Sequence, residues 1–229
     1  MRRRIDNKMK KFMKSAVMAL AVLGALAVAM PAAHASIIFQ LNNGGSCCSP
    51  GPFGNIEVTQ TTSSLVTITE TLAPGENFAG TGAGEALAFN IAGDPSIIIT
   101  ISAGNLANFA AGVGTTGASP FGTFDYFVHC TTCAGGSGPT GPLTFTVQLS
   151  SLGALDINSF KTLSVLPPGS TQAYMASDIC YHPGSDTCNT NPTGNVGSTG
   201  FSSVPEPISL SLVGGGLLAL GLFRKRFVA

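Results

Sequence analysis

Tryptophan is absent from this chain, histidine occurs three times, and charged residues make up only 10% of its 229 residues. Soluble cytosolic domains normally carry about 25% charged residues, so the composition argues against an ordinary cytosolic enzyme. The formal net charge is zero. That value is a sum over unlike segments of the chain, because charges of opposite sign are separated along it.

Basic residues are nearly missing from the middle of the chain. Seven of the eleven Lys and Arg residues precede residue 15, three close to the C-terminus form one run, and Lys161 alone lies between. Nine acidic residues fall between positions 36 and 203, so this stretch carries one minus nine, or −8. Since no basic stripe is present, the sequence excludes nucleic acid as an expected partner.

The first 35 residues have the layout of a secretory signal. A basic start is followed by an uninterrupted apolar run, and Ala33 and Ala35 place small residues before Ser36. This pattern predicts export through the Sec translocon and cleavage by signal peptidase after Ala35. The apolar run is shorter than the roughly 20 residues of a spanning helix. Met9, which is followed by two lysines, is an alternative start to Met1.

The C-terminal 26 residues combine three elements in a fixed order. Val204, Pro205, Glu206 and Pro207 precede an uncharged apolar segment, 208–223, and a basic run then ends it. As a helix, the apolar segment would reach roughly 24 Å at about 1.5 Å per residue, which is short of the roughly 30 Å hydrocarbon core. The predicted transmembrane helix is therefore poorly matched to permanent residence in a membrane.

The basic run that ends this segment consists of Arg224, Lys225 and Arg226. Positive residues favour the cytoplasmic side, so we expect this run to act as a stop-transfer signal. The proline motif then lies on the outer face of the inner membrane. A plain single-pass anchor with a proline linker is the alternative interpretation.

The tail from 204 to 229 looks like the PEP-CTERM sorting signal of Gram-negative bacteria, a tail type also named "ice-binding protein C-terminal domain". The resemblance implies recognition by exosortase, a membrane cysteine protease, and cleavage near Pro205–Pro207. The body would then be released or transferred to the cell surface, as a GPI signal is removed from its mature protein. The resemblance covers the tail alone and implies no activity for the body.

The body between the two end signals has the texture of short β-strands. Apolar residues alternate with threonine at period two in segments such as 65–69 and 143–147, between clusters of Gly, Pro, Asn and Ser. We predict an all-β domain over 36–188, an antiparallel β-sandwich or jelly roll of about nine strands. The expected strands are 37–41, 55–61, 65–72, 86–91, 97–102, 123–128, 143–149, 157–165 and 172–179.

Two segments of the body are predicted to be other than strand. The Ala-rich stretch 105–111 could form a short helix between Gly104 and Gly112. Residues 189–203 are rich in Gly, Thr, Ser, Asn and Pro, which predicts a flexible linker before the tail.

Six cysteines occur as three local pairs, and export would place them where disulfides form. Cys180 and Cys188 flank a Pro-Gly turn and rank first as a pair, Cys130 and Cys133 rank second, and Cys47 and Cys48 could form only a strained vicinal bridge. Six cysteines allow 15 connectivities, so exchange among the pairs stays open.

Redox catalysis or zinc binding is the alternative for the Cys130-to-Cys133 motif, with His129 and His182 nearby. Both are disfavoured, because loop residues rather than a helix follow the motif and structural zinc needs four ligands. The string 112–117 matches G-x-G-x-x-G, but a proline after it blocks the helix that a nucleotide site needs. We therefore expect no metal, no cofactor and no catalytic residue.

The sequence thus predicts a non-catalytic exported protein of the cell surface or extracellular matrix, first anchored in the inner membrane and then processed by exosortase. A carbohydrate-binding module for exopolysaccharide is an alternative, and self-association is an alternative partner. Tyr126, Tyr174 and Tyr181 are the only tyrosines available for sugar stacking. A secreted hydrolase is a third possibility. Ice binding is not supported, since no regular Thr-x-Thr array runs along the chain.

Overall fold

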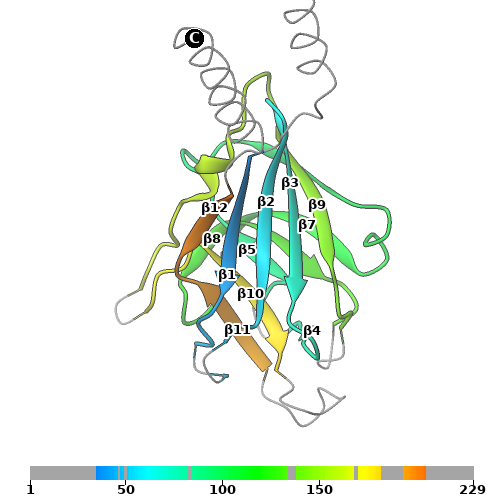
Figure 1. The fold of residues 1–229 in the computed structure, drawn as a ribbon, viewed down its shortest axis with the longest axis vertical. Helices are drawn as coiled ribbons and strands as arrows, with labels where there is room; N and C mark the ends of the chain where they lie inside the picture. The colour runs from blue at the N-terminus through cyan, green and yellow to red at the C-terminus, as the bar shows by residue number, and fades with distance from the viewer. Residues whose placement is uncertain are drawn as a thin grey trace, which may run out of the picture. The chain divides into compact units, whose positions relative to one another are not determined.

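The computed structural model describes residues 35–45, 47–48, 51–81, 84–133, 138–167, 170–181 and 193–204. Apart from one short 3-10 helix, η1 (Ile157–Phe160), their regular elements are strands, which form two antiparallel sheets (Figure 1). The predicted all-β class is therefore confirmed. Within these ranges no helix is long and apolar enough to cross a membrane. The predicted signal and C-terminal helices lie outside the described residues.

The first sheet has six strands in the order β12-β1-β2-β3-β9-β6. It joins the start of the described chain to its end, because β1 lies between β2 and the last strand, β12. The strands are β1 (Ser36–Leu41), β2 (Gly54–Thr62), β3 (Leu65–Leu72), β6 (Ile97–Ile101), β9 (Leu143–Leu149) and β12 (Phe201–Val204).

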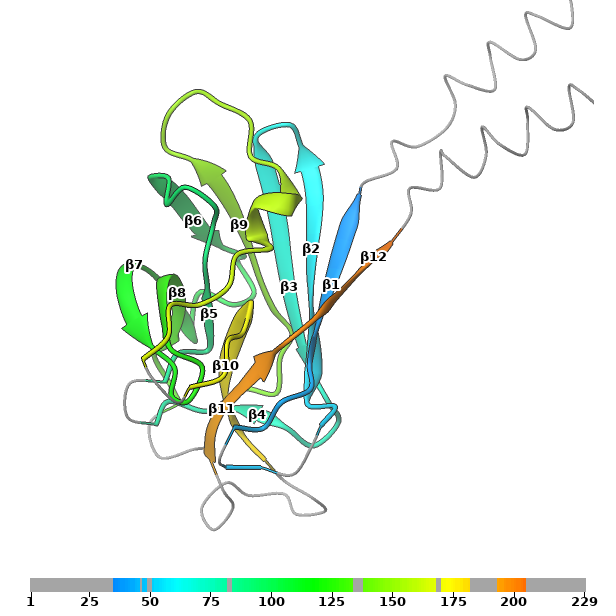
Figure 2. The same cartoon turned by 90° about the vertical axis from the view of Figure 1, so that its left-hand side faces the viewer.

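The second sheet follows the order β11-β10-β5-β8-β7, and the short β4 pairs with β10 beside β5. Figure 2 shows the two sheets as layers, with β11 and β12 following one another from the second sheet into the first. The strands are β4 (Asn77–Phe78), β5 (Leu87–Phe89), β7 (Phe109–Gly117), β8 (Thr123–Cys130), β10 (Met175–Cys180) and β11 (Thr193–Ser198).

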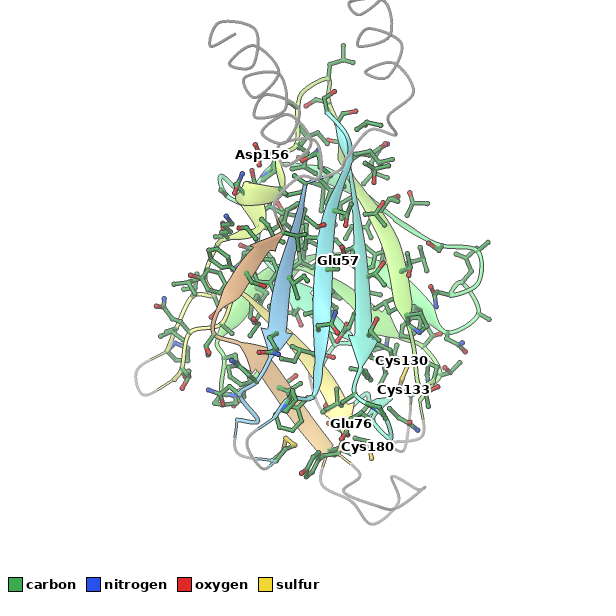
Figure 3. All side chains as sticks on the ribbon, viewed as in Figure 1. Glu57, Glu76, Cys130, Cys133, Asp156 and Cys180 are labelled. Atoms are coloured by element: carbon green, nitrogen blue, oxygen red, sulfur yellow. A yellow bond between two sulfur atoms is a disulfide. The ribbon has the colours of Figure 1, made fainter. Side chains whose placement is uncertain are left out.

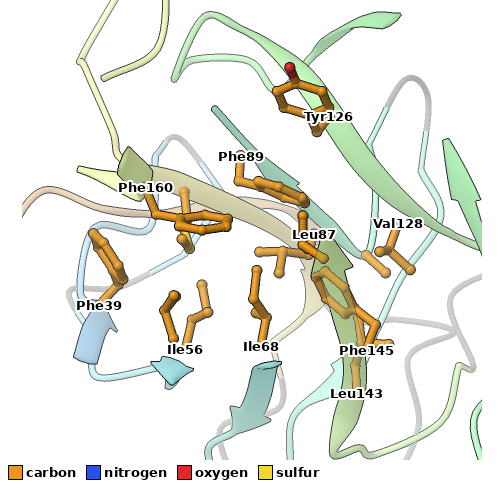
Figure 4. Packing of buried hydrophobic residues seen from close by; sticks show 14 of the residues in the cluster. Phe39, Ile56, Ile68, Leu87, Phe89, Tyr126, Val128, Leu143, Phe145 and Phe160 are labelled. Carbon is orange, nitrogen blue, oxygen red and sulfur yellow. The ribbon is translucent and has the colours of Figure 1, made fainter. Parts of the chain in front are cut away.

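The core lies between the sheets because alternate residues of their strands are apolar. In β3, for example, Val66 and Ile68 are fully buried and their threonine neighbours are half-buried. Phenylalanine fills much of the space: Phe89 lies 5.9 Å, centroid to centroid, from both Phe145 and Phe160 (Figure 4). Two antiparallel sheets with this shared core fit a β-sandwich.

Most predicted strands are present, but the expectations for two segments within 36–188 fail. Residues 157–160 form η1 instead of beginning a strand, because the Asp156 side chain caps them by accepting a hydrogen bond from Asn158 N at 2.7 Å. Residues 105–108 lie in turns and Phe109 begins β7, so no helix forms over 105–111. Four strands were not predicted: β4, β7, β11 and β12.

The predicted flexible linker is wrong for residues 193–203. Within this stretch Thr193–Ser198 pairs with β10 as strand β11, and β12 pairs with β1, so these residues belong to the sheets. Their glycines and serines suggested a linker, but neighbouring strands supply the hydrogen bonds that order them. The β-domain therefore extends to Val204 and not to residue 188. Residues 189–192 lie outside the described residues.

Candidate processing site

The two ends of the β-domain lie side by side. Ser36 of β1 is the register partner of Val204 of β12. These residues are the first after the predicted signal cleavage and the first of the predicted sorting motif. The sheet thus brings together two positions that lie 168 residues apart in the sequence. Ala33, Pro205, Glu206, Pro207 and the basic run Arg224, Lys225 and Arg226 lie outside the described residues.

The two sides of this junction differ in how the fold holds them. On the signal side, Ser36 is only 9% exposed, and the carbonyl of Ala35 accepts a hydrogen bond from Gln60 N at 2.9 Å. On the tail side, Val204 is 43% exposed at the end of the outermost strand of the first sheet. The peptide bond between Ala35 and Ser36 is therefore built into the sheet, whereas Val204 stays open to solvent.

An aromatic contact fixes the other end of β12. The Phe201 ring packs edge-on against Tyr174 at a centroid distance of 5.2 Å and lies 5.7 Å from Phe39. Nζ of Lys161, the single lysine of the body, sits 4.5 Å from the Phe201 ring centroid in a cation–π arrangement. The strand is thus held at Phe201 by side chains and along its length by backbone pairing with β1.

The described disulfides occupy the end of the sheets away from this junction. Cys130 is bonded to Cys133, Cys47 is bonded to Cys48, and Cys180 is also disulfide-bonded. Figure 3 labels Cys130, Cys133 and Cys180 at the end of the sheets opposite Asp156. Asp156 marks the end with the junction, because the next residue, Ile157, donates its backbone N–H to Gln60 Oε1, and Gln60 N donates to the Ala35 carbonyl. Cys188 lies outside the described residues.

The Cys130-to-Cys133 motif is not arranged as a redox or zinc site in the described chain. Both sulfur atoms are buried, at 4% and 0% exposure of their residues, and bonded to each other. No group of three His, Cys, Asp or Glu side chains in the described ranges could hold a metal ion. His182 lies outside them. The string 112–117 lies on edge strand β7, which β8 follows after a turn, so the helix of a nucleotide site is missing there.

His129 has a partner that the sequence does not reveal. Its Nδ1 lies 2.8 Å from Glu85 Oε2, and Glu85 Oε1 also accepts a hydrogen bond from Thr116 Oγ1 at 3.3 Å. The histidine side chain is half exposed on β8, whereas Glu85 is mostly covered. In the described part of the chain, the His129 ring has no hydrogen bond to a hydroxyl or thiol that could serve as a nucleophile.

The buried acidic residues include Asp178 on β10 of the second sheet and Glu70 on β3 of the first sheet. Asp178 accepts hydrogen bonds from the Thr81 backbone N at 2.6 Å and from its hydroxyl at 2.8 Å. Burial raises the pKa of Asp178. The hydrogen bonds from Thr81 partly offset this rise, and the nearby Glu85 carboxylate adds to it. Glu70 is fully buried, and neither carboxyl oxygen has a hydrogen-bond partner among the residues that the structure describes. Burial raises the Glu70 pKa to about 8.

The three tyrosines do not form one sugar-stacking platform. Tyr126 is buried, and its hydroxyl donates to Asp94 Oδ1 at 2.7 Å. Burial and this neighbouring carboxylate raise the Tyr126 pKa. Tyr181 packs against Phe53 at 5.6 Å near the Cys47–Cys48 end, while Tyr174 packs against Phe201.

No family model, curated protein or solved structure matches the chain.

Proposed function

We propose that the chain is a non-catalytic precursor of an exported cell-surface or extracellular-matrix protein. Signal peptidase removes residues 1–35, and exosortase acts near Pro205–Pro207 at the C-terminal sorting signal. Between these steps the predicted helix over 208–223 holds the protein in the inner membrane with its body in the periplasm. The body is a β-sandwich, of which a jelly roll is one form.

One observation carries the proposal: the β-domain begins at the residue after the predicted signal cleavage and reaches the first residue of the predicted sorting motif. The first strand begins at Ser36, and the last described strand, β12, includes Val204. The paired strands also put Ser36 and Val204, the described residues next to the two predicted cleavage positions, side by side at one end of the sheet.

The burial of Ser36 supports an order of events. A protease needs its substrate extended and accessible, and the bond before Ser36 is built into the sheet. Signal removal therefore comes before β1 joins the fold. Val204 remains exposed in the folded domain, so the sorting step is able to follow folding.

Mass spectrometry of the protein from cells tests the proposal. With active exosortase, the mature protein should lack residues 1–35 and the residues after about Pro205, while an exosortase-deficient strain should retain the tail. Glu206→Ala, a change within the motif, should reduce tail removal, whereas Ser202→Ala, on the exposed strand β12 but outside the motif, is the matched control and should leave tail removal unchanged. An intact tail in the strain with active exosortase would overturn the sorting function.

A further inference from the structure

The outer face of the first sheet carries threonines from four neighbouring strands. Register places Thr59, Thr67, Thr146 and Thr100 in one row across β2, β3, β9 and β6. A second row continues from Thr69 to Thr144. We name this surface the threonine face; its threonines are Thr59, Thr61, Thr67, Thr69, Thr71, Thr100, Thr144 and Thr146.

These side chains point away from the core, because they alternate with buried residues. Thr67 and Thr69 flank the buried Ile68 in β3, and Thr144 and Thr146 flank the buried Phe145 in β9. Hydroxyls of neighbouring strands also approach one another, with 2.6 Å between the Oγ1 atoms of Thr61 and Thr67. The face therefore presents methyl and hydroxyl groups at regular intervals in two directions.

The outer face of the second sheet is different. There Phe121, Ala118 and Ala173 from the connecting loops pack with Ala88 and other strand residues into a small apolar cluster. On the threonine face, most of the outward strand residues are polar, and Figure 3 labels one of them, Glu57 on β2. Glu57 is the single charged side chain among the described strand residues that register places on this face.

The spacing of the threonines suits a lattice of water molecules. Neighbouring strands lie about 4.8 Å apart, and alternate residues of one strand are about 6.8 Å apart. In a tetrahedral lattice with oxygens about 2.75 Å apart, molecules that share a neighbour are about 4.5 Å apart, and the perpendicular repeat is about 7.3 Å. The two patterns agree to within roughly a tenth in both directions.

We propose that the threonine face binds ice. Its hydroxyls would replace water molecules of the lattice or form hydrogen bonds with them, and its methyl groups would lie in the open spaces between those molecules. The described strand residues of the face include no aromatic ring on which a sugar could stack, which favours ordered water over a polysaccharide. The inference rests on the array across strands and not on the tail, so it is independent of exosortase processing.

The sequence does not show this array, because its threonines are distributed over four strands between positions 59 and 146. No segment repeats Thr-x-Thr along many turns, and that absence argued against ice binding at the level of sequence. Antiparallel pairing brings the short runs together, so the repeat exists across the sheet.

Inhibition of ice recrystallisation by the full chain in mild detergent, with detergent alone as the blank, tests the inference. The wild type should keep ice grains small. The double variant Thr67→Tyr, Thr146→Tyr should lose at least about tenfold in potency, since two rings in the central row keep the face from the lattice; tyrosine suits strands, so the fold should persist. Thr115→Tyr, on exposed edge strand β7, is the matched control and should leave potency unchanged.

Glu57→Thr should raise potency several-fold, because it removes the one charge and lengthens the second row. Circular dichroism confirms that each variant has the wild-type thermal transition. Wild-type protein that does not affect ice growth would overturn the inference, and so would a double variant that is folded and fully active. Retention on immobilised neutral dextran without any effect on ice would overturn it in favour of a polysaccharide ligand.

Discussion

Glu70 shows how one residue can make the stability of the domain depend on pH. Its side chain takes an inward position of β3 that an apolar residue would normally occupy, and it is fully buried. Burial raises its pKa to about 8, although the nearby Ser177 hydroxyl acts in the opposite direction. That hydroxyl donates its hydrogen bond to the Ala86 carbonyl at 2.7 Å, so within the described ranges both Glu70 oxygens lack a hydrogen-bond partner.

Since the folded-state pKa of Glu70 is above its unfolded value, the folded protein binds one more proton between these two values. Its free energy of unfolding should therefore fall from about pH 4.5 to about pH 8, by roughly 1.4 kcal/mol per pH unit. Glu70→Gln cannot ionise, so its fall should be shallower by about this amount; the raised pKa of Asp178 leaves a smaller fall of the same sign. Urea unfolding of the full chain at several pH values, followed by circular dichroism, measures it.

The half-exposed Glu57 on the neighbouring strand provides the control. Glu57→Gln should leave the slope as in the wild type. Equal slopes for the wild type and Glu70→Gln would show that Glu70 does not control the pH dependence.

At the scale of single elements, β12 is the strand whose position matters most to the proposed processing. It is four residues long, all of them exposed, and it pairs with one strand, β1. Short edge strands of this kind depend on a few contacts. In β12 the side-chain contacts gather at Phe201, where Tyr174, Phe39 and Lys161 meet its ring.

Phe201→Ala should therefore loosen β12. We expect a loss of about 1 to 2 kcal/mol in the free energy of unfolding from the aromatic and cation–π contacts. Amide hydrogen exchange should also become faster in β12 and stay unchanged in β3. Val204→Ala, at the other end of the strand, should change stability by less than about 0.5 kcal/mol. If both variants behave alike, Phe201 is not the anchor of the strand.

The elements also show how far the sequence could predict the fold. Segments 65–72 and 143–149 alternate apolar residues with threonine, and both are strands as predicted. The unpredicted β7 and β11 contain mainly Ala, Gly, Thr and Ser, so they have little strand preference of their own. They form strands because β8 and β10 supply hydrogen-bond partners, which a reading of local composition does not include.

The same reason explains which parts of the site could be predicted. The two predicted end signals are local patterns, so the residues at their edges follow from the sequence one by one and stay predictions. Their adjacency could not, because it depends on the β1–β12 pairing across the whole domain. The contact between His129 and Glu85 joins positions 44 residues apart and was missed for that reason.

At the scale of the whole molecule, the disulfides and the two ends of the β-domain lie at opposite ends of the sheets. Disulfides lie at one end of the sheets, and the Ser36–Val204 junction lies at the other. The bonded pairs are local, with 1 and 3 residues of separation. Such short loops remove little entropy from the unfolded chain, so they constrain the connecting loops more than they stabilise the domain as a whole.

Non-reducing peptide mapping of the exported protein should recover Cys47 joined to Cys48 and Cys130 joined to Cys133. It should also recover Cys180 joined to Cys188, the pair that the intervening turn predicts. Labelling of thiols before and after reduction counts free cysteines and serves as the control. Free thiols at all six positions, or links between the three pairs, would contradict this framework.

The pairing of Ser36 with Val204 also makes the domain nearly a closed ring. Register partners in an antiparallel pair have Cα atoms about 5 Å apart, so a bridge of two or three residues would join the last strand to the first. The same strand pairings could therefore form in a chain that begins at a different strand. A circularly permuted domain, opened in the exposed connection after β9, would keep every strand pairing of the native fold.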